Sequence, residues 1–428
     1  MENNNLTMLD NENLIPFTAG YRLVGMENLP QWFLKFRRLG FESYIQNFDF
    51  VRLDKKLFEF ISSSDFSNSN IEVFPSFDML LKYPMFDIEA YTVVLVNGKY
   101  SAELSSEEEL PFSVFSDGII NSVYEDEKFL DGKLRCDDNV FVSLNSAFLS
   151  NGIVIQINDG EKLEKPIHIV SIITSMNEKI CSFPRVFFKV GNNVKVDVIE
   201  SLLSFDEENY FENRVVELFV GKNSDVNYYK FLSVSKNSCI VENSFVNVLE
   251  GAHFNQVSFG KNLGIIRLKN IFEIDVGADV KFVSSFDANR DNDVSVEVDL
   301  KHIGERAESD VSLFAVASDK ANVSFKTSVE CKRQIDKVKT SQNSRILLAS
   351  NDAVGRIKPF QNIESEGVKA FHGAVVSGIS AKDLFFLESR GLGEQDAKNL
   401  IFKSCLANIL QNIHNNKIFD EYSKFLCL

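Results

Sequence analysis

The chain has 428 residues, enough for about three average domains or for one elongated repeat protein. Lys and Arg total 45 against 61 Asp and Glu, and the resulting net charge of -16 disfavours nucleic acid and anionic membrane lipid as partners. No apolar run approaches the length that a membrane-spanning helix needs.

The N-terminal part, residues 1–140, is predicted to be a helical and mixed segment. Residues Met1 to Glu12 are polar and acidic and contain neither an apolar stretch nor an Arg-rich amphipathic pattern. No secretory or organelle signal is therefore predicted, and a cytoplasmic location is expected. The run from Leu29 to Gly40 has helical periodicity, and Gly40 predicts the end of that helix because glycine readily forms a C-cap.

The six cysteines are dispersed along the chain, with no two closer than 22 positions. This spacing argues against a metal-binding knuckle and against a dense disulfide framework, and it indicates reduced thiols. The cysteines are Cys136, Cys181, Cys239, Cys331, Cys405 and Cys427.

The middle of the chain, residues 141–378, contains a repeat. Between Lys189 and Thr327, a turn with a glycine recurs after an apolar strand and before a strand of alternating polarity. The intervals are 30, 30, 26 and 27 residues, and the glycines are Gly191, Gly221, Gly251, Gly277 and Gly304. A fixed period with one turn residue per unit is typical of a solenoid, whose coils bury their apolar faces by stacking on one another.

The repeat units are predicted to be strands, because their apolar residues alternate and proline is absent between Lys189 and Thr327. The sequence therefore predicts a mainly β fold, a parallel β-helix with Val, Ile, Phe and Leu turned inward. A β-sandwich with coincidental turn spacing is the alternative.

The C-terminal part, residues 379–428, is predicted to be a helical domain. Ser380 and Asp383 form a helix start signal, and Gly391 predicts the end of this first helix. A second helix is predicted from the helical spacing of Ala397, Leu400, Ile401, Leu406 and Ile409. The resulting hairpin either caps the open end of the solenoid or leaves one face free for a partner.

Three motifs precede or enter this hairpin: Lys358-Pro359, then Phe371-His372-Gly373-Ala374, then Phe385-Phe386-Leu387-Glu388-Ser389-Arg390-Gly391. Their order resembles the C-terminal core of the SufB/SufD family of iron–sulfur cluster assembly proteins. The segment from Gln342 to Leu348 places the resemblance on the SufD side, since SufB proteins typically have Cys-Asp-Ser-Leu-Leu there. The resemblance implies a central right-handed parallel β-helix flanked by helical terminal segments.

The resemblance also implies a role for His372, on the strands that pair with a SufB-like subunit. Imidazole and thiolate both bind iron, so His372 would be one half of a metal site whose cysteine belongs to the partner chain. This chain alone would hold no cluster stably, and a transient iron–sulfur cluster would form at the interface. Relatives often have Cys and Glu where this chain has Ala370 and Asn362, which leaves fewer ligands.

The family's C-terminal region docks SufC, an ABC-type ATPase subunit, and the residues expected to do so here are Phe385, Leu387, Arg390, Leu400 and Ile401. The chain itself has no phosphate-binding loop and no hydrolase motif, so a scaffold rather than an enzyme is predicted. An exposed last coil would also allow two copies of the chain to pair as a homodimer. The alternatives are a SufB-like chain that holds the cluster itself and a carbohydrate-active β-helix enzyme.

Overall fold

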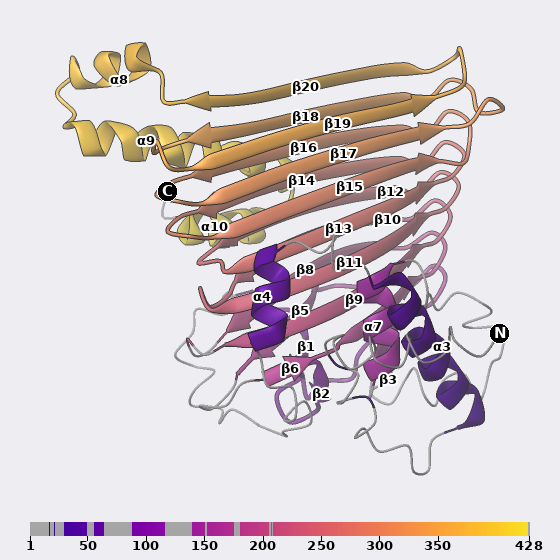
Figure 1. Ribbon diagram of the computed structural model, residues 1–428. Coiled ribbons are helices and arrows are strands. Elements are labelled where there is room, and N and C mark those ends of the chain that lie inside the picture. Colours follow the sequence, from indigo (N-terminus) through magenta and orange to yellow (C-terminus); the bar gives the residue numbers. More distant parts are fainter. Residues whose placement is uncertain are drawn as a thin grey trace, which may run out of the picture.

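The computed structural model describes residues 17, 21, 30–48, 55–63, 88–115, 139–149, 152–174, 180–204, 207 and 209–426. Strands make up 50% of it, so the fold is mainly β as predicted, and they form a solenoid of about 8 turns with helices at both ends of the chain (Figure 1). Each turn contributes one strand to each of two facing sheets.

Sheet A contains, in spatial order, β2 (Lys99–Ser101), β1 (Tyr91–Val96), β5 (Ile167–Ile173), β8 (Lys195–Ser204), β10 (Asp225–Ser233), β12 (His253–Lys261), β14 (Asp279–Ala288), β16 (Glu308–Ala317), β18 (Lys339–Leu348) and β20 (Lys369–Gly378). Sheet B contains β19 (Val354–Ile363), β17 (Asn322–Cys331), β15 (Asp293–His302), β13 (Ile265–Ile274), β11 (Ser238–Val248), β9 (Tyr210–Val220), β7 (Arg185–Val190), β4 (Ile153–Ile157) and β3 (Ser113–Phe115), and β6 (Ile180–Ser182) also pairs with β9.

The strands of successive coils pair in parallel, for example β16 with β18 and β17 with β19. Antiparallel pairing occurs at the N-terminal end, between β1 and β2 and between β3 and β4. The β-sandwich alternative is therefore wrong, because the repeating unit is a coil with one strand in each sheet.

Side chains alternate between the inner and the outer face along each strand, and the inward ones form the main core between the two sheets. In β15, Val294, Val296, Val298 and Leu300 are all buried and belong to one apolar cluster that continues through the stack. Residues in register on neighbouring parallel strands turn to the same face, so each inward position forms a column that runs from coil to coil. Apolar columns are the main source of stability in this fold.

The predicted glycine turns are confirmed, and they need glycine for two different reasons. Gly251 and Gly277 have φ of +66° and +61°, a left-handed backbone that glycine adopts without strain. At Gly221 the reason is close packing, because a Cβ there would lie 2.3 Å from the carbonyl oxygen of Gly191 in the preceding coil.

The N-terminal helices α3 (Gln31–Asn47), α4 (Lys55–Ser63) and α7 (Val140–Phe148) cover the outer face of sheet B (Figure 1). The predicted helix end at Gly40 is wrong, since α3 continues to Asn47. Gly40 instead lets α3 approach α7 closely: a Cβ at this position would lie 2.7 Å from the Cβ of Ser146. Close contact between α3 and α7, rather than the end of a helix, therefore explains the glycine at position 40.

The predicted C-terminal hairpin is confirmed as α8 (Ala381–Glu388) and α9 (Glu394–Leu406), followed by a 3₁₀ helix η2 (Ala407–Asn412) and by α10 (Asn416–Phe425). The hydroxyl of Ser380 accepts a hydrogen bond from the Asp383 amide at 3.3 Å, as the start signal predicted. After α8, Gly391 has φ of +92°. Both local signals therefore act as expected.

These helices do not cap the open end of the solenoid, so that part of the prediction is wrong. α9, η2 and α10 pack against the outer face of sheet A, where Leu406, Ile409 and Tyr422 join an apolar cluster with Tyr229 and Phe231. An apolar outer face on sheet A needs cover, and the C-terminal segment supplies it. Among the helices that the structure describes, none has the length and apolar character required to cross a membrane.

Candidate functional site

The last coil of the solenoid consists of β19 and β20, and each lies at the edge of its sheet (Figure 1). Backbone groups in a parallel strand point alternately to the two neighbouring strands. The amide of Lys369 bonds the carbonyl of Val338, so residues 369, 371, 373, 375 and 377 face β18 and the intervening residues face the open edge. The free side of β20 therefore includes the amide and carbonyl groups of His372.

Strand β19 is consistent with the same alternation. The amide of Val354 bonds the carbonyl of Ala321, which turns the odd-numbered residues of β19, including Pro359, toward the open edge. Proline has no N–H and is tolerated within a strand where no neighbour needs that donor. Lys358-Pro359 in the motif is thus an edge feature.

His372 lies on β20, in register with Gln342 of β18 and, one coil earlier, with Val311 of β16. Val311 belongs to the core between the sheets, so His372 occupies an inward column. It is nevertheless exposed, because no coil follows β20. A chain stacked on this end would cover the imidazole.

Two glutamines to which the sequence analysis gave no role in the site, Gln342 on β18 and Gln361 on β19, line the solenoid interior beside His372. Gln342 is buried, and its side-chain amide hydrogen bonds with the Phe360 carbonyl at 3.4 Å and with the Gln361 side chain at 3.5 Å. Gln361 occupies an inward-facing position of β19, in register with the core residue Val329. A polar residue at an inward position of a strand was the available signal, since buried amides require partners.

In the coils that precede the last one, three polar side chains form a short series of hydrogen bonds inside the solenoid. The imidazole Nε2 of His302 lies 3.0 Å from the Ser309 hydroxyl, which donates to Thr340 Oγ1 at 2.8 Å. Burial lowers the pKa of His302 to about 4, so this ring is neutral near pH 7. Ala370, one of the two positions that the family resemblance singled out for a missing ligand, lies in register with Thr340 and ends the column at the open coil.

The other position that the family resemblance singled out for a missing ligand is Asn362. It lies on β19 in register with Glu330 and alternates with Gln361 and Ile363, so it faces away from the interior that holds His372. The structure therefore brings His372 together with Gln342 and Gln361, and it leaves Asn362 on the opposite face of β19.

Large apolar side chains are exposed on the outer faces of the last coil. Phe371 is 69% exposed, and Val375 on the same strand and Phe360 on β19 are each 50% exposed. An exposed apolar group at a free strand edge is a recurrent feature of protein interfaces. The last coil thus offers backbone groups, apolar side chains and an imidazole together.

The residues predicted to dock an ATPase lie on α8, α9 and the turn between them. Phe385 and Leu400 are 70% and 48% exposed, while Leu387 and Ile401 are half-buried. Arg390 is exposed, and its guanidinium lies 4.8 Å from the centre of the Phe386 ring, within the range of a cation–π contact. α8 buries none of its residues, which leaves most of its surface accessible.

A separate group of charged residues lies deep inside the solenoid, between β8, β9, β10 and β11. Arg214 pairs with Glu200, Glu212 and Glu242, and Lys230 pairs with Glu200 at 2.9 Å and with Glu242 at 2.6 Å. Burial alone would raise the pKa of Glu200, but the charges of Lys230 and Arg214 outweigh it and lower this pKa to about 2. Burial raises the pKa of Glu212, although Arg214 opposes the shift.

Comparison with known proteins gives a family match. The family described as "SUF system FeS cluster assembly, SufBD core domain" matches residues 172–405, more than half of the chain. An iron–sulfur cluster assembly SufBD family protein of Synechocystis is 24% identical over 335 residues, which cover 75% of this chain and 74% of that protein.

Two Bacillus subtilis proteins are similar to the chain at a comparable level. The iron–sulfur cluster assembly protein SufD is 21% identical over 294 residues, which cover 67% of this chain and 65% of SufD. SufB is 23% identical over 273 residues, which cover 62% of this chain and 57% of SufB. The matched region therefore spans less than two thirds of either Bacillus protein.

Proposed function

The chain belongs to the SufBD core family of the SUF system for iron–sulfur cluster assembly, and we propose that it is a SufD-like scaffold subunit that joins a SufB-like chain through β19 and β20. The observation that carries the proposal is the open last coil. It presents unpaired edge groups, exposed Phe371 and Val375, and the inward-column residue His372 in one place. A partner of the same fold would add its own strands to these edges.

The His372 imidazole is proposed as one ligand of a site shared with the partner. Iron in a cluster usually has four ligands, and cysteine thiolate is the commonest protein donor. The sequence has no cysteine between Cys331 and Cys405, so β19 and β20 bring no thiolate to the open coil. The partner would supply it, and the nascent cluster would pass on as cargo.

The missing thiolate also favours the SufD-like role over the SufB-like one. Cys331 is buried in the interior core and Cys405 lies on α9, so neither is on the open coil. In the SufB-like alternative the chain would hold the cluster itself, which requires a thiolate on that coil.

We further propose that α8 and α9 dock the ATPase subunit, a SufC-like chain. α8 projects from the body of the solenoid, and its exposed Phe385 and Phe386 would be buried on binding (Figure 1). Aromatic and Arg side chains are enriched at the centres of interfaces, which fits Phe385, Phe386 and Arg390. ATP would be bound by the partner.

The test of the shared site is reconstitution of the complex with the SufB-like and SufC-like proteins of the same organism. Iron and sulfide bound per complex are measured for the unaltered chain, for His372→Ala, and for His253→Ala as a control on an exposed histidine of β12. We expect His372→Ala to form the complex but to lose most of the cluster. Full cluster content in His372→Ala would contradict the proposed ligand.

The docking proposal is tested by co-purification with the ATPase subunit. The double change Phe385→Ser and Phe386→Ser should release the ATPase while the SufB-like chain stays bound. Phe419→Ser is the matched control, because Phe419 is an exposed phenylalanine on α10, elsewhere in the C-terminal segment. Retention of the ATPase by the double variant would reject α8 as the docking element.

A further inference from the structure

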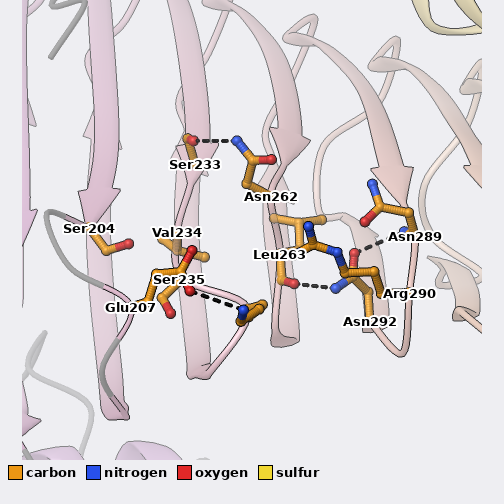
Figure 2. Close-up of a pocket in the computed structure, with 11 residues that line it drawn as sticks. Ser204, Glu207, Ser233, Val234, Ser235, Asn262, Leu263, Asn289, Arg290 and Asn292 are labelled. Carbon is orange, nitrogen blue, oxygen red and sulfur yellow. Dashed lines mark hydrogen bonds and ion pairs between the residues drawn. The ribbon is translucent and has the colours of Figure 1, made fainter.

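A polar hollow of about 420 Å³ lies along the turns that connect sheet A to sheet B (Figure 2). Four successive turns contribute to it, those after β8, β10, β12 and β14, so it is well separated along the stack from the last coil. Its lining residues are Ser204, Glu207, Ser233, Val234, Ser235, Lys236, Asn262, Leu263, Asn289, Arg290 and Asn292. The size is that of a small-molecule site.

The charges in the hollow favour an anion. Lys236 pairs with Glu207 at 3.0 Å, which leaves Arg290 as the excess cation of the lining. In the part of the chain that the structure describes, no side chain hydrogen bonds with the Arg290 guanidinium. Hydrogen bonding and charge from Lys236, with a smaller effect from Arg290, lower the pKa of Glu207, so the carboxylate senses both cations. The three charged lining residues that the structure describes, Lys236, Arg290 and Glu207, sum to a charge of +1 in a chain of net charge -16.

The framework around Arg290 is held in place by hydrogen bonds. Its amide donates to the Asp319 carboxylate at 2.8 Å, and its carbonyl accepts from the Lys320 amide at 2.7 Å. Asn292 donates to the Leu263 carbonyl and accepts from the Asn289 amide at 2.9 Å. These bonds fix two adjacent turns, so a ligand would meet a preorganised backbone.

The remaining polar residues of the lining are able to hydrogen bond with hydroxyl groups of a ligand. The Asn262 side-chain amide donates to the Ser233 hydroxyl at 3.3 Å, and Figure 2 shows this bond between the last residue of β10 and the turn after β12. Ser204 supplies a further hydroxyl. Among the lining residues that the structure describes, Val234 and Leu263 are the apolar ones and none is aromatic, so these residues offer little to a neutral apolar ligand.

We propose that this hollow binds a small hydroxylated molecule that carries an oxyanion, such as a sugar phosphate. The oxyanion would lie against Arg290 and Lys236, since a guanidinium fork and an ammonium both bind phosphate oxygens. The ligand hydroxyls would bond Asn262, Ser233 and Ser204. This inference is independent of the proposed role in cluster assembly.

The experiment is isothermal titration of the full chain with glucose 6-phosphate, glucose and inorganic phosphate in parallel. Arg290→Gln is compared with Arg306→Gln as a matched control. Arg306 is also an exposed arginine in a turn with positive φ, 59° against 56° for Arg290, but it lies in a turn from sheet B to sheet A. Thermal unfolding of both variants verifies that each one is folded.

We expect glucose 6-phosphate to bind the unaltered chain and Arg306→Gln equally, and Arg290→Gln roughly tenfold or more weakly, as loss of a charge-assisted hydrogen bond predicts. Glucose and inorganic phosphate should each bind more weakly than glucose 6-phosphate. Absence of binding, equal binding of glucose, or equal affinities of the two arginine variants would overturn the site. Inorganic phosphate binding as tightly as glucose 6-phosphate would overturn the role given to Asn262 and the serines.

Discussion

The hydroxyl of Tyr422 donates a hydrogen bond of 3.1 Å to the main-chain carbonyl of Lys230, although 192 residues separate the two positions. Through this bond α10 is fixed across the outer face of sheet A. The Tyr422 ring is fully buried and meets Phe231 edge to face, with 5.4 Å between ring centroids. The C-terminal segment is therefore an integral part of the solenoid body.

Removal of the Tyr422 ring should destabilise the fold strongly. We expect Tyr422→Ala to lower the free energy of unfolding by about 3–5 kcal/mol, and Tyr422→Phe, which loses the hydrogen bond alone, by about 1 kcal/mol. Phe419→Ala on the exposed side of α10 is the control, with an expected change of about 0.5 kcal/mol or less. Urea unfolding measures all three, and a similar small loss for Tyr422→Ala would show that α10 is dispensable.

Arg214 should be needed for stability because it neutralises buried carboxylates. Its pairs with Glu212 and Glu242 measure 3.1 and 3.2 Å, and all three side chains are almost fully buried. We expect Arg214→Ala to cost about 3–5 kcal/mol, since the carboxylates lose their main counter-charge. Lys195→Ala breaks the exposed pair with Asp225 and should cost less than about 1 kcal/mol. Equal losses in chemical unfolding of the two variants would contradict this ranking.

Two buried histidines should make the fold sensitive to mild acid. Burial lowers the pKa of His168 and of His302 from 6.5 to about 4. The unfolded chain takes up these protons first, so their contribution to stability is complete above pH 6.5 and is lost as the pH falls toward 4. Each histidine accounts for a loss on the order of 3 kcal/mol.

The variant that tests this pH dependence is His302→Gln, which retains an amide for Ser309 and does not titrate. Stability of this variant should fall less steeply between pH 6.5 and 4 than that of the unaltered chain. Glu200, with a pKa lowered from 4.5 to about 2, loses its contribution between pH 4.5 and 2, which is mostly below this window. His253→Gln on the exposed face serves as the control. An unchanged slope in His302→Gln would assign the acid sensitivity to other groups.

Proline substitutions in β20 should separate partner binding from strand stability. Ala374 turns its amide to the open edge, whereas the amide of Val375 faces β18. We expect Ala374→Pro to weaken association with the SufB-like chain and to change unfolding little, as Pro359 is already accommodated at such a position in β19. Val375→Pro removes a ladder bond and should destabilise the last coil by about 3 kcal/mol or more. Undiminished association of Ala374→Pro, measured by co-purification, would reject edge pairing.

Gly40→Ala tests two opposing effects in α3. Helix propensity alone predicts stabilisation by about 1 kcal/mol. The added methyl group would lie 2.7 Å from Ser146 Cβ and 2.9 Å from the Ala147 nitrogen, and overpacking of this kind costs about 1–3 kcal/mol. We therefore expect net destabilisation in thermal unfolding, and a raised Tm would show that α3 and α7 move apart easily.

Local patterns in the sequence determined the repeat and the ends of several elements. The glycine period predicted the solenoid because one coil of about 26–30 residues is a short-range unit, and the Ser380 start signal depends on atoms three residues apart. The alternation of apolar residues likewise predicted strands with one buried face. Each of these features is governed by neighbours along the chain.

Tertiary structure decided which distant residues meet. Glu200, Arg214 and Glu242 form one cluster, and His372 shares an interior with Gln342 and Gln361, because strands a coil apart align in a specific register. The alternation in the sequence excludes a one-residue shift, which would turn every side chain to the other face, but it does not distinguish registers that differ by two residues. The packing of α10 on sheet A and the hollow beside Arg290 also join residues that are far apart in the sequence, so both became apparent only in the folded chain.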